Sequence, residues 1–201
     1  MCMLSHSPIR EVWRGAIACV VAGTMLPALA EVRVTSETHS YRVPGSTAKS
    51  VAPYMLRHPY AGDHGGAFAN IRPHYSLSVS TKQVGDICRA DDIDLKIHFV
   101  VTLPEAVDLH RMSGKTRAAW NGFTAFARRH EAWHQASYVN CAKAFVAAAK
   151  RQKADACYAV SANVRKMFRQ AKRDCEVKQL AFDRQQARVV PGLTLFNMAG
   201  Y

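Results

Sequence analysis

The stretch at residues 113–152, SGKTRAAWNGFTAFARRHEAWHQASYVNCAKAFVAAAKRQ, predicts one long helix. It is rich in alanine and free of proline, and Ser113 or Thr116 could cap its start. Mostly apolar side chains recur in it at spacings of three and four residues, the period of one helix face. That face comprises Trp120, Phe123, Ala127, His130, His134, Tyr138, Cys141 and Phe145. We therefore expect an amphipathic helix with both histidines on its buried side.

The sequence before this helix has the signatures of strands. The best of them is IDLKIHFVVTLP at residues 93–104, where apolar residues occupy every second position and Pro104 ends the run. His98 falls on the wetter face and is expected to be an ordinary surface histidine. Upstream we expect extended chain at 32–47, a short helix within 48–60, and a loop rich in glycine and proline that leads into a strand at 75–83.

A second helical segment is expected at about residues 158–186, because Pro191-Gly192 and a short apolar tail follow it. The pattern predicts an α+β fold in which a small antiparallel sheet packs on a long helical hairpin. We expect residues 31–201 to form one domain, with strands and loops mainly at 31–112 and the helical hairpin at 113–190.

Residues 1–30 are expected to be a secretory signal peptide. Arg10 and Arg14 precede an apolar run that ends in Ala28-Leu29-Ala30, and this order is typical of export signals cleaved after the last alanine. A lipoprotein modified at Cys19 and a retained N-terminal helix are the alternatives. The prediction is therefore an exported protein, periplasmic or secreted, without stable membrane insertion after cleavage.

The chain is basic, with a formal net charge of +12 at pH 7. Loss of Arg10, Glu11 and Arg14 with the signal peptide removes a net +1 and leaves about +11. Because the protein is expected to be exported, nucleic acid is not expected as a partner, and the positive charge favours anionic polymers of the envelope. A simpler interpretation is that the surplus lysines and arginines solvate a long helical surface.

The motif RRHEAWHQ contains His130-Glu131-Ala132-Trp133-His134, which has the form His-Glu-x-x-His. Histidines four residues apart on a helix can reach one zinc ion, and the adjacent glutamate can act as a general base on water activated by that ion. Two unpaired histidines in a buried stripe would be costly, and a metal would satisfy them. The alternative is a pair of hydrogen-bonded core histidines.

Cleavage of the signal peptide would leave four cysteines, which in an oxidising compartment favour two disulfides with three possible pairings: Cys88, Cys141, Cys157 and Cys175. If Cys141 pairs with Cys175 across an antiparallel hairpin, Cys157 lies at the turn and is left for Cys88. His134 then lies level with residue 182, next to Asp183. Pairing of Cys141 with Cys157 would instead place His134 level with Val164, where no carboxylate is near.

The third metal ligand is thus less obvious from the residues than the first two. The downstream acidic candidates are Asp155, Asp174, Glu176 and Asp183. We prefer Asp183 because the Cys141–Cys175 register explains it chemically, while an ordinary surface aspartate on a helix is the alternative.

Several landmarks occur in an order that resembles a known family. They are SYRVPGSTAKSV near the start, a lone Cys88 before the alternating strand, Trp120 with Phe123 ahead of RRHEAWH, a cysteine in the second helix, and FDR at 182–184. The chain resembles the predicted secreted zinc-dependent protease family of Gram-negative bacteria, a domain of unknown function with an HExxH motif. Some relatives follow the aspartate with Thr-x-His-Gly, whereas this chain has Gln186-Ala187-Arg188-Val189.

The resemblance implies a single zincin-like metallopeptidase domain that acts on a peptide or protein in the cell envelope. It implies Zn²⁺ as cofactor, His130 and His134 as ligands, and Glu131 as the catalytic base, while Asp183 matches the family's aromatic-Asp motif. Two other interpretations are an inactive zincin-like protein that binds envelope components and a helical domain stabilised by disulfides without a metal.

Overall fold

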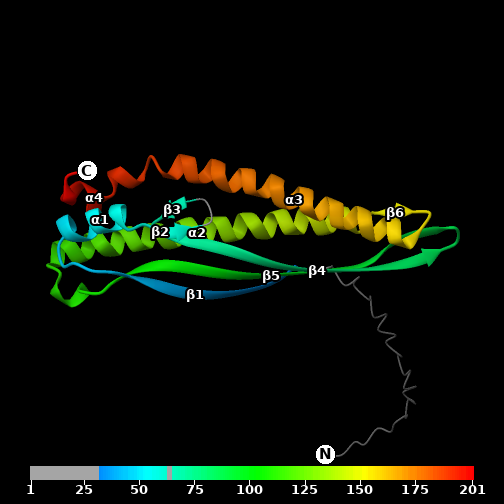
Figure 1. The fold of residues 1–201 in the computed structure, drawn as a ribbon, viewed down its shortest axis with the longest axis horizontal. Helices are drawn as coiled ribbons and strands as arrows, with labels where there is room; N and C mark the ends of the chain where they lie inside the picture. The colour runs from blue at the N-terminus through cyan, green and yellow to red at the C-terminus, as the bar shows by residue number, and fades with distance from the viewer. Residues whose placement is uncertain (1–31, 63–64) are drawn as a thin grey trace, which may run out of the picture.

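The computed structural model describes residues 32–62 and 65–201 (Figure 1). The signal peptide expected at residues 1–30 lies outside the described residues. The fold is α+β, as the sequence patterns predict: one long sheet is covered on one face by two long helices (Figure 1). Among the described residues, no helix is long and apolar enough to cross a membrane.

The main sheet has β5 (Ile87–Ala106) at its centre, between β1 (Arg33–Val43) and β4 (Asn70–Val84). The short strand β6 (Lys153–Ala154) pairs with one end of β5. Pairing with β4 and β6 is antiparallel, but β1 pairs with β5 in parallel. The sheet is therefore mostly antiparallel, as expected, and has one parallel edge that the sequence patterns did not predict. Along the chain, β1, β4 and β5 alternate in direction. The strand that lies beside β1 is β5 rather than β4.

The helical hairpin consists of α2 (Gly114–Ala149) and α3 (Cys157–Gln186). Ser113 is the N-cap of α2, because its hydroxyl oxygen accepts a hydrogen bond from the Thr116 backbone nitrogen at 3.2 Å. The alternating residues of β5 point under the hairpin, and Leu95, Ile97 and Phe99 are fully buried there. The alternate residues of β5 and the apolar face of α2 thus pack against each other in one core.

A second, smaller core closes the end of the molecule that carries the C-terminus (Figure 1). It joins α1 (Ala48–Arg57) and α4 (Thr194–Ala199) to the first turns of α2, with the 3₁₀ helices η1 (Leu109–Arg111) and η2 (Val190–Gly192) as connections. Phe196 of α4 is buried there against Phe68 and Phe123, with ring centroids 5.3 and 5.7 Å away. The apolar C-terminal tail is therefore part of the fold.

The segment expected to be a loop before residue 75 is more ordered than its composition indicates. It contains a two-stranded hairpin, β2 (Tyr60–Gly62) and β3 (Gly65–Ala67), and the first residues of β4. Close packing explains the glycine at position 66, because a Cβ on Gly66 would lie only 2.8 Å from the Pro59 ring. Small residues thus mark close packing of the chain at this hairpin.

Two disulfides join the elements as the preferred pairing predicts. Cys141 of α2 bonds to Cys175 of α3, with their Cα atoms 6.0 Å apart. Cys88 of β5 bonds to Cys157 at the start of α3, with Cα atoms 5.0 Å apart. One disulfide sets the register of the hairpin, and the other ties the hairpin to the sheet.

Candidate metal centre

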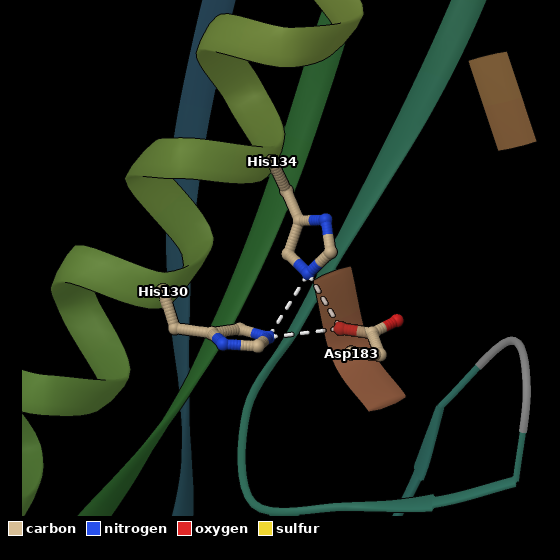
Figure 2. A group of neighbouring side chains, drawn as sticks. All are labelled: His130, His134 and Asp183. Carbon is tan, nitrogen blue, oxygen red and sulfur yellow. Dashed lines mark hydrogen bonds and ion pairs between the residues drawn. The ribbon is translucent and has the colours of Figure 1, made fainter. Parts of the chain in front are cut away.

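Two adjacent turns of α2 and the last turns of α3 bring three polar side chains together (Figure 2). His130 and His134 project from one side of α2, and Asp183 meets them from α3. His134 is 6% exposed, whereas His130 lies half-buried at the edge of the helix stripe. The register set by Cys141 and Cys175 therefore places Asp183 beside both histidines.

The three facing atoms form a nearly equal-sided triangle. His134 Nε2 lies 2.8 Å from Asp183 Oδ1 and 2.9 Å from His130 Nε2, and His130 Nε2 lies 3.0 Å from Asp183 Oδ1. Ligand atoms of a tetrahedral zinc site with bonds of about 2.0–2.1 Å are about 3.3 Å apart. The three atoms would have to separate by only a few tenths of an ångström, so these residues could hold a metal ion.

The chemistry of the donor set also fits a cation. Two imidazole nitrogens and a carboxylate oxygen converge on one point, and such atoms act as ligands through their lone pairs. In addition, His130 Nδ1 is buried and has no hydrogen-bond partner in the part of the chain that the structure describes. The His130 ring is held instead by Phe182, whose centroid is 4.9 Å away.

Aromatic packing supports both histidine rings from the α3 side. Phe182 stacks on Trp133 with centroids 3.7 Å apart and meets the His134 ring edge-on at 5.2 Å. Since Phe182 directly precedes Asp183, the packing that fixes the phenyl ring also fixes the carboxylate. The site is thus positioned by contacts as well as by the nearby disulfide.

His134 has an ordered partner on its second nitrogen. Its Nδ1 lies 2.7 Å from Oε1 of Gln179, which is 1% exposed. Burial alone would lower the pKa of His134, but its hydrogen bonds to Asp183 and Gln179 outweigh burial and raise it. For Asp183 the signs are reversed: burial alone would raise its pKa, but its contacts with His130 and His134 lower that pKa strongly.

Glu131 lies deeper than the helical pattern predicts. It is 4% exposed, so the buried stripe of α2 runs through Glu131 as well as His134, and His130 is left at its edge. Burial raises the pKa of Glu131 from 4.5 to about 7. No ion pair or hydrogen bond holds its carboxyl group within the described ranges, which leaves that group available to a ligand.

A cleft of about 380 Å³ lies over these residues. His130, Glu131, His134 and Asp183 line it on one side, and the β2–β3 hairpin with the start of β4 lines it on the other. Phe68, Phe123 and Phe126 make part of its wall apolar. The candidate metal ligands and a carboxyl group of raised pKa therefore share one cleft with room for a small substrate segment.

The other acidic candidates on α3 and before it do not reach the centre. Asp174 accepts a hydrogen bond from Gln170 at 2.7 Å, and Glu176 accepts one from the Tyr138 hydroxyl at 3.2 Å. Asp155 lies before α3, which begins at Cys157, and is absent from the cluster. Gln179 was not expected, although its spacing contains the signal. Cys175, Gln179 and Asp183 follow one another at intervals of four and share one helix face.

Comparisons with known proteins identify the family. Residues 38–189 match a family described as "Bacterial protein of unknown function (DUF922)". Searches of curated proteins and of solved structures found no significant match. The matched region includes β4, β5, both long helices, all four disulfide cysteines and the whole candidate metal centre. The chain therefore belongs to the DUF922 family of bacterial proteins.

Proposed function

We propose that this protein is a zinc-dependent hydrolase of the cell envelope, a peptidase with a zincin-like catalytic helix. One observation carries the proposal: the His-Glu-x-x-His residues and Asp183 meet in a cleft, with three donor atoms within 3.0 Å of one another. In this proposal His130, His134 and Asp183 hold the ion and Glu131 is the general base. The donor set of two imidazoles and one carboxylate is one that catalytic zinc sites use.

Zinc in such a site supplies Lewis acidity, which polarises a substrate carbonyl and makes water a better nucleophile at neutral pH. Glu131 would take a proton from the attacking water on a carboxylate oxygen and then deliver it to the leaving amine. Glu131 is buried next to both histidines and lines the same cleft, so its carboxyl group is placed for both transfers. The apolar cleft wall would exclude bulk water from the reacting groups.

Two further observations support an exported setting. The protein has two disulfides, which persist in oxidising compartments. The N-terminal sequence has the order of a secretory signal, although it lies outside the described residues. We therefore propose a periplasmic or secreted protein and a peptide or protein of the envelope as its substrate.

Glu131→Gln tests the proposed mechanism. The variant is nearly isosteric and leaves the three donor residues in place, so it should bind zinc as the wild type does. Cleavage of a random-sequence peptide library, followed by mass spectrometry, should fall by at least about 100-fold. Asp174→Asn is a matched control, because Asp174 is exposed on α3, accepts a hydrogen bond from Gln170 and is not part of the three-residue cluster.

Three results would contradict the proposal in different ways. Absence of zinc from wild-type protein purified without chelators, together with failure to bind added zinc, would exclude the metal centre. A wild-type protein that binds one zinc ion but cleaves nothing in the library would instead favour an inactive envelope-binding protein. Equal cleavage by the wild type and Glu131→Gln would exclude Glu131 as the base.

A further inference from the structure

Gln179 occupies a buried position between α2 and α3, directly behind the candidate metal centre. Its Oε1 lies 2.7 Å from His134 Nδ1. Its Nε2 donates to Ser137 Oγ at 2.9 Å and to Cys175 Sγ at 3.4 Å. The side chain is 1% exposed, so every polar atom of its amide must find partners inside the protein. These contacts account for both ends of the amide.

The contacts fix which way the amide points. A glutamine nitrogen can only donate and its oxygen can only accept. Cys175 Sγ is part of a disulfide, carries no proton and can only accept, so the nitrogen belongs on its side and the oxygen faces His134. The Ser137 hydroxyl, which can donate or accept, then accepts from the same nitrogen. His134 Nδ1 must then carry a proton and donate it to Gln179. In neutral His134 the lone pair is consequently on Nε2, which is the atom that faces His130 and Asp183.

The two histidines differ in this respect. His134 has a buried partner that selects its donor nitrogen, whereas His130 Nδ1 has none among the described residues. Outer partners of this kind orient a metal-binding imidazole and raise its basicity. Gln179 therefore fixes the orientation of the His134 ring before any ion arrives and leaves Nε2 as the atom that a metal would bind.

The support of Gln179 comes from an interhelical disulfide. Cys175 lies one helical turn before Gln179 on α3 and is bonded to Cys141, which lies one turn after Ser137 on α2. The disulfide sulfur that accepts from Gln179 is thus tied to the same helix that carries His134. Ser137 Oγ and Cys175 Sγ, the two acceptors of the amide nitrogen, are therefore both held at fixed positions along the axis of α2.

We propose that Gln179 is the positioning residue of the metal centre, held in place by the Cys141–Cys175 disulfide. The inference rests on the proposed metal site but not on hydrolysis. It assigns the disulfide a second role: besides joining α2 to α3, it holds the amide that determines the affinity of His134 for a metal.

Zinc affinity measured with a chromophoric chelator tests this in four variants of the mature protein. Gln179→Leu removes both ends of the amide contact and should weaken zinc binding by about 10–100-fold. Gln179→Glu keeps an acceptor for His134 Nδ1 and should restore most of that loss. Cys141→Ala/Cys175→Ala should weaken binding about 10-fold. Cys88→Ala/Cys157→Ala removes the other disulfide and should leave zinc affinity unchanged.

A second readout separates positioning from general destabilisation. In the metal-free wild type, the His134 Nδ1 proton is buried and bonded, so NMR should show it as a slowly exchanging imidazole resonance. Gln179→Leu should abolish this resonance and Gln179→Glu should retain it. Circular dichroism of each variant shows whether the helices are intact. Cobalt(II) in place of zinc should give an altered visible spectrum in Gln179→Leu, because the ligand field changes.

The outcomes distinguish this inference from the proposed function. If the wild type binds no zinc, the metal centre itself is wrong. If the wild type binds zinc and folded Gln179→Leu binds it equally well, Gln179 has no positioning role. If both disulfide variants lose affinity to the same extent, the loss reflects stability alone, and the role of Cys141–Cys175 is excluded.

Discussion

Asp183 Oδ1 lies 2.8 Å from Nε2 of His134, although 49 residues separate them in the sequence. The contact exists because α2 and α3 run side by side in one register, which the Cys141–Cys175 disulfide fixes. A carboxylate from a second helix thereby completes a set of donors that the His-Glu-x-x-His helix begins. The site therefore depends on the packing of the two helices, since a shift in their register would move Asp183 away from the histidines.

Replacement of Asp183 tests the ligand set. Asp183→Asn should lower zinc affinity by more than about 100-fold, because loss of a charged ligand exceeds the effect of losing an outer partner. Isothermal titration of the metal-free protein with zinc measures the change. Asp174→Asn on the same helix should bind zinc as the wild type does. Equal affinities in the two variants would remove Asp183 from the site.

Glu131 should make the stability of the metal-free protein fall as the pH rises. Burial raises its pKa from 4.5 to about 7, so the folded state holds the proton more tightly than the unfolded state. Glu131 therefore imposes no penalty below pH 4.5, and the penalty grows up to about pH 7. Glu131→Gln should exceed the wild type by on the order of 2–3 kcal/mol at pH 8 and match it at pH 4.

Urea unfolding with EDTA present, followed by circular dichroism at both pH values, measures this difference. Comparison with the wild type at each pH cancels the contributions of groups that do not interact with Glu131. The difference still includes the change at His134 and Asp183, whose charges interact with the Glu131 carboxylate. A difference between the two proteins that does not change with pH would contradict the buried position of Glu131.

Two glycines should respond in opposite ways to alanine. Gly122 lies exposed within the first half of α2 with open space around a Cβ, so Gly122→Ala should stabilise the protein by about 0.5–1 kcal/mol. Gly45 has φ +117°, and a Cβ there would overlap the Ser50 hydroxyl that belongs to the cap of α1. Gly45→Ala should therefore destabilise by more than about 1 kcal/mol. Thermal unfolding compares the two variants, and a shift of the same sign in both would count against these backbone assignments.

The C-terminal helix should contribute strongly to stability. Phe196 is 2% exposed and packs on Phe68 and Phe123, so Phe196→Ala should cost about 3–5 kcal/mol in urea unfolding. Tyr201 is 56% exposed, and Tyr201→Ala should stay within about 0.5 kcal/mol of the wild type. A small loss in Phe196→Ala would mean that α4 is not packed as described.

The long elements could be predicted from the sequence because each has a strong period of its own. The second helix, expected at about 158–186, is α3 at Cys157–Gln186. The alternating strand expected at 93–104 is the central part of β5, which extends to Ile87–Ala106. Its first residues were missed because backbone pairing with β4 continues past Asp91 and Asp92, where the apolar alternation stops. Its last residues, Glu105 and Ala106, were missed because they are held by pairing with β1.

The arrangement of strands and the surroundings of the site needed tertiary information. No local pattern tells which of two later strands will lie beside β1, so its parallel pairing with β5 was not foreseen. The burial of Glu131 depends on how α2 is rotated against the sheet, which a wide apolar stripe does not specify. The spacing of Gln179 places it on the helix face of Cys175 and Asp183, but its role becomes visible only in its contact with His134.

The two disulfides attach α3 covalently at two points and leave its last turns without such a cross-link to the rest of the fold. Cys157 anchors its start to the sheet and Cys175 anchors its middle to α2. Asp183 lies eight residues beyond the second anchor, a span of about 12 Å at 1.5 Å per residue. Beyond this anchor, the carboxylate is kept beside the histidines by non-covalent contacts, chiefly the stacking of Phe182 on Trp133. An ion bound by the histidines and Asp183 would therefore add a third link from α3 to the rest of the fold and would stiffen the last turns of α3.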